Sequence, residues 1–294
     1  MNRSAPLVAG IGEVLWDKFP DADRLGGAPA NFVFHAAQLG AQARIVSRIG
    51  CDPGGSELRR QLEGRGVSTE YLQTDPVQPT GTVFVRLRDG QPNYTITAPV
   101  AWDFLEPTGD LKQLASGLDA ICFGTLAQRN AVSQETIRWA VTSCPKNALR
   151  LFDVNLRQSF YTNEIIEFGL WHATVLKLNA DELACVGRLY GWEAHPENII
   201  SRLFQHFPLE WIALTRGAEG CELHTREQTI RSAAVPVKCV DAVGAGDAFS
   251  AMLAVGLLRK LPLQEIADRC NQIGAYVASQ AGAMPELPAE LIAF

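Results

Sequence analysis

The chain lacks the cysteine and histidine spacings of disulfide-rich and zinc-binding proteins. Its seven cysteines are an odd number, they are widely spaced, and no two of them form a Cys-x-x-Cys pair. The five histidines include no His-Glu-x-x-His arrangement, which disfavours a zinc hydrolase. We therefore expect free, buried thiols in the reducing environment of the cytoplasm.

Long hydrophobic runs and excess positive charge are also missing. The first apolar run, Leu7–Ile11, is too short for a secretory signal, and no later run approaches the length of a membrane span. The formal net charge is -6, so nucleic acid and anionic membrane surfaces are not expected partners. A small anionic ligand stays open, because a helix N-terminus can bind one.

Two common nucleotide-binding motifs are absent. No G-x-x-x-x-G-K-[ST] segment occurs, which disfavours a P-loop protein. The dinucleotide fingerprint fails as well, because Phe249 stands at the third glycine position after Gly244 and Gly246. A nucleotide-dependent oxidoreductase is therefore disfavoured.

Short apolar runs alternate with helical patterns along the 294 residues, of which 47% are apolar. This length permits one large domain or two smaller ones. The runs that we interpret as strands are Leu7–Ile11, Arg44–Ile49, Ala120–Phe123, Leu149–Val154, Val175–Leu178 and Trp211–Thr215. The helical patterns are Ala30–Leu39, Gly54–Glu63, Ser133–Cys144, Ala180–Tyr190 and Pro196–Gln205. The alternation predicts a three-layer α/β fold around a mostly parallel sheet.

Two segments interrupt this alternation. Gly81–Arg86 and Asn93–Thr97 flank an Asp89-Gly90 turn, which is a hairpin signal, and Glu13–Leu25 is long for a loop. We interpret them together as a small β insertion projecting from the main sheet. An ordinary edge hairpin is the alternative.

The C-terminal region predicts a strand, a glycine turn and two helices. Val235–Val240 is interpreted as the strand. The helix Gly246–Arg259 is apolar nearly all the way round, which is typical of a helix in the centre of a core. Leu263–Ser279 follows as a second helix.

Polar residues and glycines follow five of the predicted strands. They are Gly12-Glu13, Gly124-Thr125, Asp153 to Arg157, Asn179 with Glu182, and Thr215-Arg216-Gly217. Ligands of an open parallel sheet bind at the carboxyl ends of its strands, so we expect one site there. Any one of these residues alone could be a cap or a turn residue.

The segment Asp241–Phe249 is the strongest motif. Gly244 and Gly246 permit a tight turn into a buried helix, whose free N–H groups and dipole would bind an anion. We expect the dipole to keep Asp247 ionised beside that anion, ready to accept a proton from an attacking hydroxyl. The alternative is a first-turn acid that the dipole merely favours.

A second glycine cluster, Gly26–Asn31, opens the first predicted helix. Its two glycines allow a ligand to approach the backbone, and the Asn31 amide suits a sugar hydroxyl. A plain turn into the helix is the alternative.

These residues resemble the two signatures of the ribokinase-like (PfkB) carbohydrate kinases. Gly26–Asn31 with Gly50–Gly54 resembles the first signature, and Asp241–Phe249 resembles the second. Asn179-x-x-Glu182 and Thr215-x-Gly217-x-x-Gly220 are similar to two further family motifs. The resemblance spans about residues 7 to 288. It implies a single ribokinase-like domain over residues 1–294, with lid insertions near 13–25 and 81–100.

The resemblance also implies a role for each matching residue. Asp247 would be the catalytic base, and Gly244, Ala245 and Gly246 would form the anion hole. Arg157 would reach the phosphate or the sugar, and Asp17, Gly27 and Asn31 would hold sugar hydroxyls. ATP would lie against Thr215, Gly217, Gly220 and Asn271, and Asn179 and Glu182 would organise Mg²⁺ through water. A K⁺ ion would involve Asp241 and Ala281–Ala283.

Gly12–Asp17 and Asp153–Arg157 look most like the fructokinase branch, which implies phosphorylation of fructose to fructose 6-phosphate. The alternatives are a kinase for 2-keto-3-deoxygluconate, ribose or a nucleoside, and a catalytically silent sugar-binding protein. The family's lid often pairs subunits, which implies a homodimer. Ala242 and Val243 depart from the threonine of many members, and Trp16 and His35 are unusual neighbours of the sugar pocket.

Overall fold

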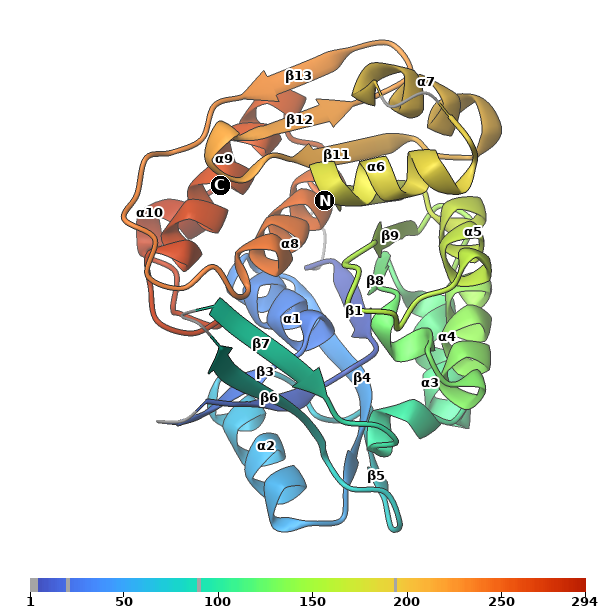
Figure 1. Cartoon of the computed structure of the whole chain (residues 1–294), viewed down its shortest axis with the longest axis vertical. Coiled ribbons are helices and arrows are strands. Elements are labelled where there is room, and N and C mark those ends of the chain that lie inside the picture. Colours follow the sequence, from blue (N-terminus) through green and yellow to red (C-terminus); the bar gives the residue numbers. More distant parts are fainter. Residues whose placement is uncertain (1–4, 20–21, 89–90, 193–194) are drawn as a thin grey trace.

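The computed structural model describes residues 5–19, 22–88, 91–192 and 195–294. Within these ranges the chain forms a nine-stranded main sheet, in the order β13-β12-β11-β10-β9-β8-β1-β4-β5 (Figure 1). Its strands are β1 (Leu7–Ile11), β4 (Gln42–Gly50), β5 (Leu72–Asp75), β8 (Ala120–Phe123), β9 (Leu149–Asp153), β10 (Val175–Asn179), β11 (Trp211–Thr215), β12 (Cys221–His224) and β13 (Thr229–Ser232).

The seven strands from β5 to β11 in this order run parallel, and β12 runs antiparallel to both of its neighbours, β11 and β13. All six predicted strands are present in it. Most of their residues are buried, as expected of strands that helices cover on both faces.

Two groups of helices cover the two faces of the sheet. One apolar core contains residues of α1 (Ala28–Gln38), α2 (Pro53–Gly64), α8 (Ala245–Leu258) and α9 (Leu263–Ala278). The other contains residues of α3 (Gly109–Gly117), α4 (Ala131–Ser143), α5 (Asn163–His172), α6 (Ala180–Leu189) and α7 (Pro196–His206). A short helix, α10 (Ala289–Ile292), follows α9. The predicted three-layer α/β fold is therefore confirmed.

Helix α8 is deeply buried in its layer. Every residue from Ala248 to Gly256 is buried, and the helix lies between α1 and α9 (Figure 1). The prediction of a central helix from its all-round apolar sequence is confirmed. Its placement fixes the glycine turn at its N-terminus against the carboxyl ends of the strands.

The two predicted insertion segments form one small sheet, in the order β3-β2-β6-β7. Its strands are β2 (Leu15–Lys18), β3 (Asp23–Gly26), β6 (Gly81–Arg88) and β7 (Gln91–Ile96). β2 pairs in parallel with β6, so segments far apart in sequence build this sheet together. The predicted turn residues Asp89 and Gly90 lie outside the described residues.

The predicted strand Val235–Val240 is wrong. This segment pairs with no strand, and the side chains of Val235, Val237 and Val240 are 38%, 44% and 59% exposed. Alternating β-branched residues favour a strand only where a neighbouring strand offers hydrogen bonds, and the sheet ends at β13. Pro236 also lacks the N–H that a ladder needs.

The expectation of buried cysteines also needs correction. Cys122, Cys144, Cys221 and Cys270 are buried and Cys185 is partly buried, whereas Cys51 and Cys239 are exposed. All seven are free thiols.

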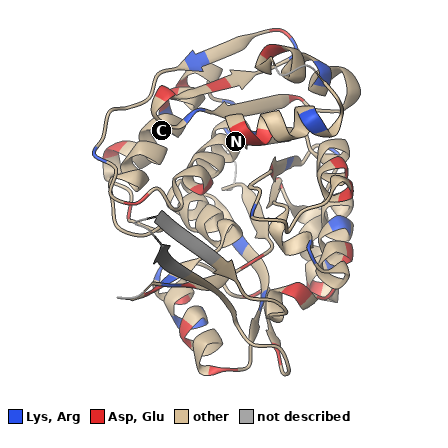
Figure 2. Cartoon of the chain, viewed as in Figure 1, with Lys and Arg blue, Asp and Glu red and all other residues tan. Residues whose placement is uncertain are grey.

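The outer helices carry charges of both signs. Figure 2 shows Lys and Arg interspersed with Asp and Glu on α2, α4 and α5. Among the described helices, none is both long enough and apolar enough to cross a membrane.

Candidate active site

A pocket of about 810 Å³ lies between the carboxyl ends of the main-sheet strands and the small sheet. Asp17 and Val83 of the small sheet line one side, and Asp247 at the start of α8 lines the other. The predicted site residues in the lining are Asp17, Gly27, Asn31, Arg157, Asn179, Glu182, Thr215, Gly244, Gly246 and Asp247. These residues come from the ends of β9, β10 and β11, from β2 of the small sheet and from the two signature loops.

The pocket lies where the topology of the sheet reverses. β1 lies between β4 and β8. The chain adds β4 and β5 on one side of β1, and then adds β8 and the later strands on the other side. Such a switch point opens a crevice outside the strand ends. Glu13 after β1, Thr125 after β8 and Asn179 at the end of β10 all line this crevice or the small cavity beneath it. The predicted convergence of polar strand ends is confirmed.

Asp247 stands in the first turn of α8 and lines the pocket. Its Oδ2 accepts a hydrogen bond of 2.7 Å from Nδ2 of Asn31. Burial and the nearby Asp153 carboxylate raise the pKa of Asp247 from 3.8 to about 6, although Asn31, Lys177 and Arg157 oppose this. The carboxyl is therefore mostly ionised at neutral pH, but burial outweighs the helix dipole on which the sequence argument relied.

The turn that precedes Asp247 requires glycine. Gly244 caps α8 with φ 82° and ψ -14°, in the left-handed region. A Cβ there would lie 2.6 Å from the Cβ of Ala283. The N–H of Ala245 donates weakly to the Ala242 carbonyl oxygen at 3.4 Å, whereas the N–H groups of Gly246 and Asp247 have no hydrogen-bond partner among the described residues and can bind an anion that enters the pocket.

A buried ion pair lies beneath this turn, and the sequence analysis missed it. Nζ of Lys177 contacts Oδ1 and Oδ2 of Asp153 at 3.0 and 3.1 Å, and Oγ of Ser250 donates to Oδ2 at 2.9 Å. A Cβ on Gly246 would lie 3.0 Å from Nζ of Lys177, so the ammonium group lies close behind the turn. The signal in the sequence is a lone lysine inside the apolar strand Val175–Asn179.

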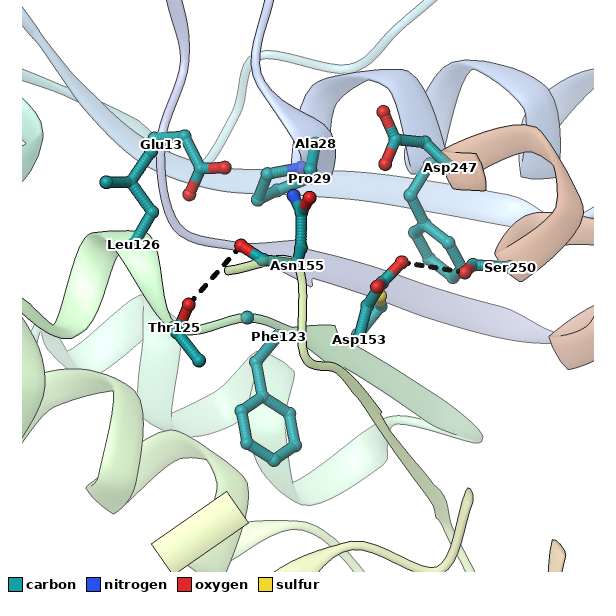
Figure 3. A pocket seen from close by; sticks show the side chains of 13 residues that line it. Glu13, Ala28, Pro29, Phe123, Thr125, Leu126, Asp153, Asn155, Asp247 and Ser250 are labelled. Carbon is teal, nitrogen blue, oxygen red and sulfur yellow. Dashed lines mark hydrogen bonds between the residues drawn. The ribbon is translucent and has the colours of Figure 1, made fainter. Parts of the chain in front are cut away.

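Glu13 is a second residue that was named in a motif but not assigned to the site. Its side chain is 5% exposed and lines the pocket. Burial, with a smaller contribution from Asp247, raises the pKa of Glu13 from 4.5 to about 7. Glu13, Asp153 and Asp247 surround a further cavity of about 20 Å³ (Figure 3). That volume holds about one water molecule.

The three residues predicted to hold sugar hydroxyls, Asp17, Gly27 and Asn31, all line the pocket. Burial raises the pKa of Asp17 from 3.8 to about 6, and Arg157 opposes this. Gly27 has φ 112°, and a Cβ there would lie 2.5 Å from the Glu13 carbonyl oxygen. Oδ1 of Asn31 is buried and has no partner among the described residues. Asn31 therefore keeps an acceptor while its amide nitrogen donates to Asp247.

Asn179 and Glu182 form a capping box at the start of α6. Oδ1 of Asn179 accepts from the Glu182 N–H at 2.9 Å, and Oε2 of Glu182 accepts from the Asn179 N–H at 2.8 Å. Oε1 of Glu182 accepts from the Leu156 N–H at 3.0 Å. Each carboxylate oxygen keeps a further lone pair, and hard oxygen donors suit Mg²⁺ that retains its water. No cluster of three or more metal-ligating side chains occurs in the described part of the chain.

Five predicted residues lie outside the pocket lining: Ala245, Gly217, Gly220, Asn271 and Asp241. Nδ2 of Asn271 donates to the carbonyl oxygens of Ser232 and Ala233 at 3.0 and 3.2 Å, so it fastens α9 to the segment after β13. Both oxygens of Asp241 already accept hydrogen bonds from the protein.

Arg157 lines the pocket and interacts electrostatically with Asp17 and Asp247. Its residue is exposed, and its guanidinium makes no hydrogen bond or ion pair with the residues that the structure describes. It follows Asn155, which has φ 40° and also lines the pocket. Among the pocket-lining side chains, Arg157 is thus a cation that is available to an anionic ligand.

Known proteins of the same fold are sugar kinases and related kinases. The fold matches a fructokinase double mutant from Vibrio cholerae in a fructose-, ADP- and potassium-bound form, with a TM-score of 0.83, 25% identity and coverage of 99% of this chain and 98% of that one. It also matches aminoimidazole riboside kinase from Salmonella enterica, with a TM-score of 0.81, 24% identity and coverage of 98% and 100%. These neighbours confirm the ribokinase-like fold.

The sequence itself is 31% identical to a fructokinase of Escherichia coli over 297 residues, which covers 95% of each chain. The profile of the "pfkB family carbohydrate kinase" matches residues 22–290. The chain therefore belongs to the pfkB family of carbohydrate kinases, as its two signatures indicated.

Proposed function

We propose that this protein transfers the γ-phosphoryl group of ATP to a hydroxyl of fructose, giving fructose 6-phosphate. The observation that carries the proposal is the position of Asp247. Its carboxylate lines the pocket, one turn from the left-handed Gly244 and beside the N–H groups of Gly246 and Asp247, which have no partner among the described residues. A base and an anion site are thus adjacent, which is the arrangement that phosphoryl transfer to a hydroxyl requires.

In this mechanism Asp247 accepts the proton of the attacking sugar hydroxyl. Asn31 orients the carboxylate through its 2.7 Å hydrogen bond. The backbone of Gly244, Ala245 and Gly246 stabilises the negative charge on the transferring group. Lys177 adds positive charge from behind the turn, and Arg157 does so from the open side of the pocket.

ATP would lie along the ends of β10 and β11, against Thr215, Gly217 and Gly220. Asn271 would act here by holding the segment after β13, on the adenine side. Asn179 and Glu182 would hold Mg²⁺ through water molecules, and the ion would supply charge neutralisation to the phosphates. ADP in the Vibrio cholerae fructokinase supports the choice of an adenine nucleotide.

The sugar would lie between the small sheet and α8, with Asp17, Gly27 and Asn31 on its hydroxyls. The Asp17 carboxyl disfavours a sugar that is already phosphorylated, because like charges repel. The 31% identity to the Escherichia coli fructokinase supports fructose over 2-keto-3-deoxygluconate, ribose or a nucleoside.

We propose that residues 1–294 act as one kinase domain and that the small sheet is its lid. Leu15, Val83 and Ile96 of this sheet face the pocket, so closure would exclude water from the phosphoryl group. Phe84 on β6 is 41% exposed, which supports pairing of two lids in a homodimer. Sedimentation of the purified chain tests the pairing, and a monomer at all concentrations would contradict it.

A direct assay of ADP release tests the proposed function. Fructose, ribose, 2-keto-3-deoxygluconate and adenosine are compared with wild-type protein and with Asp247→Asn. We expect fructose to have the highest kcat/KM, and the variant to lose at least ~100-fold in kcat, since a general base contributes about 10²–10⁴-fold. Asp110→Asn, in the exposed first turn of α3, is the matched control. Full turnover in Asp247→Asn would refute the mechanism.

A further inference from the structure

Arg24 and Asp241 join the small sheet to the loop before α8. Nη1 of Arg24, on β3, lies 3.1 Å from Oδ2 of Asp241, and the two side chains are 34% and 15% exposed. The guanidinium also lies 4.4 Å from the ring centre of Phe19, which orients it. A full positive charge therefore rests against this carboxylate.

Two backbone N–H groups also donate to Asp241, and only one lone pair of Oδ1 is left without a protein donor. Oδ2 also accepts from the Gly282 N–H at 3.2 Å, and Oδ1 accepts from the Val243 N–H at 3.0 Å. Asp241 thus connects three segments: the small sheet, the turn before α8 and the loop after α9.

The same loop is held from the other side by His35 of α1. Nε2 of His35 lies 2.9 Å from the Ala283 carbonyl oxygen. A carbonyl can only accept, so Nε2 carries the hydrogen. The side chain is fully buried, and burial lowers the pKa of His35 to about 4, so the ring is neutral at pH 7.

These contacts bear on the anion hole. Ala283 is packed so closely against Gly244 that a Cβ on the glycine would lie 2.7 Å from the Ala283 carbonyl oxygen. Asp241 precedes this turn and Ala283 packs against it. The contacts that fix Asp241 and Ala283 therefore also fix the position of the N–H groups that would bind the phosphoryl group. Loss of the positive charge that neutralises Asp241 would therefore displace the turn at Gly244.

The residues do not fit the K⁺ ion that the family resemblance implied at Asp241 and Ala281–Ala283. A K⁺ ion at Asp241 would lie beside the Arg24 guanidinium and be repelled by it. It would also compete with the N–H of Gly282 and with the ring N–H of His35 for its oxygen ligands. Asp17 is paired with Arg24 in the small sheet, so its carboxyl is a second acidic group near the guanidinium.

We propose that Arg24 takes the electrostatic place of a monovalent cation at Asp241, so that the activity of this chain does not depend on K⁺. Arg24 is then a positioning residue, acting through Asp241 on the glycine turn at Gly244. The proposal rests on the proposed kinase function, and it separates this chain from the potassium-bound fructokinase of Vibrio cholerae.

The test compares wild type with Arg24→Gln in KCl, NaCl and tetramethylammonium chloride at equal ionic strength. ADP is quantified by chromatography, so no cation-dependent coupling enzyme is needed. We expect wild-type kcat/KM to change less than about twofold between the salts. Arg24→Gln should lose about tenfold or more in tetramethylammonium and recover in KCl, since removing one partner leaves a charge unpaired. Arg24→Lys should stay indifferent to the salt.

A stimulation of the wild type by K⁺ alone would overturn the proposal. A loss in Arg24→Gln that no cation recovers would overturn it too, because it would make Arg24 a purely structural contact. The exposed Arg60→Gln on α2 is the matched control, and it should behave as wild type. The melting temperature of each protein in each salt is the second readout. A K⁺-specific rise in Arg24→Gln alone supports the proposal even if no sugar is phosphorylated, which keeps it separable from the proposed function.

Discussion

At the scale of single residues, the environment of Asp247 differs from what its sequence position suggests. A first-turn acid at a helix N-terminus should have a lowered pKa, because the dipole favours its charge. Here burial beside Asp153 raises the pKa to about 6. The residue that accepts the proton is therefore tuned close to neutral pH, where a general base is most effective.

The pH profile of kcat/KM should report this value. The base must be ionised, so activity should be constant above pH ~7 and fall about tenfold per unit below the Asp247 pKa of about 6. The profile is measured with fructose and saturating ATP. Asp17 has a raised pKa as well, so Asp17→Asn serves as the control, and the acidic limb should stay in place in that variant. A limb near pH 4 would contradict the assignment.

Residue types and spacing predicted the site well where a motif requires a backbone conformation that only glycine adopts easily. Gly27 and Gly244 stand in the left-handed or strained positions that their motifs imply. Lys177 and Glu13 were not assigned, because a charged residue in or after an apolar strand gives no sign of its partner. Their partners, Asp153 and Asp247, lie 24 and 234 positions away and meet them only in the folded sheet.

At the scale of elements, the site depends on how α8 begins. Buried Ala248–Gly256 anchors the helix in the core, while Gly244 turns its first N–H groups toward the pocket. The apolar composition of this segment predicted a central helix, because a helix that is apolar on every face is stable only when it is buried on every face. The same reasoning failed for Val235–Val240, since strand formation depends on a neighbour that periodicity does not reveal.

Replacing Gly244 by alanine should disable the turn without unfolding the protein. The new Cβ would be strained at φ 82° and would lie 2.6 Å from Ala283, so the turn and the loop after α9 must separate. We expect kcat to fall by about 10²-fold or more, as for the loss of an oxyanion-hole donor.

The matched control for this variant is Gly64→Ala, at the end of α2. Its Cβ meets nothing within 4 Å, so kinetics should stay at the wild-type level. Circular dichroism of both variants checks that α8 and the sheet are retained. Wild-type kcat in Gly244→Ala would show that the turn does not stabilise the phosphoryl group.

At the scale of the whole molecule, the topology brings several carboxyl groups into one crevice. The pKa values of Asp17, Glu13 and Asp247 are about 6, 7 and 6, all above their ordinary values. The folded state therefore holds protons that the unfolded chain releases. The contribution of these three groups to the free energy of unfolding is greatest below their unfolded pKa values, near 4, and is lost as the pH rises through the folded values. Burying these carboxyl groups therefore lowers the free energy of unfolding at neutral pH.

Glu13→Gln should reveal this loss, because glutamine keeps the shape of the side chain and removes its charge. The pKa of Glu13 rises from 4.5 to about 7, and a shift of about 2.5 units corresponds to at most about 3.4 kcal/mol at pH 8. We expect the variant to melt a few degrees above wild type at pH 8 and to match it at pH 4. Glu290→Gln, exposed on α10, should change neither value. A destabilised Glu13→Gln at pH 8 would mean that the carboxylate is stabilised by its surroundings, and that burial does not dominate its energetics.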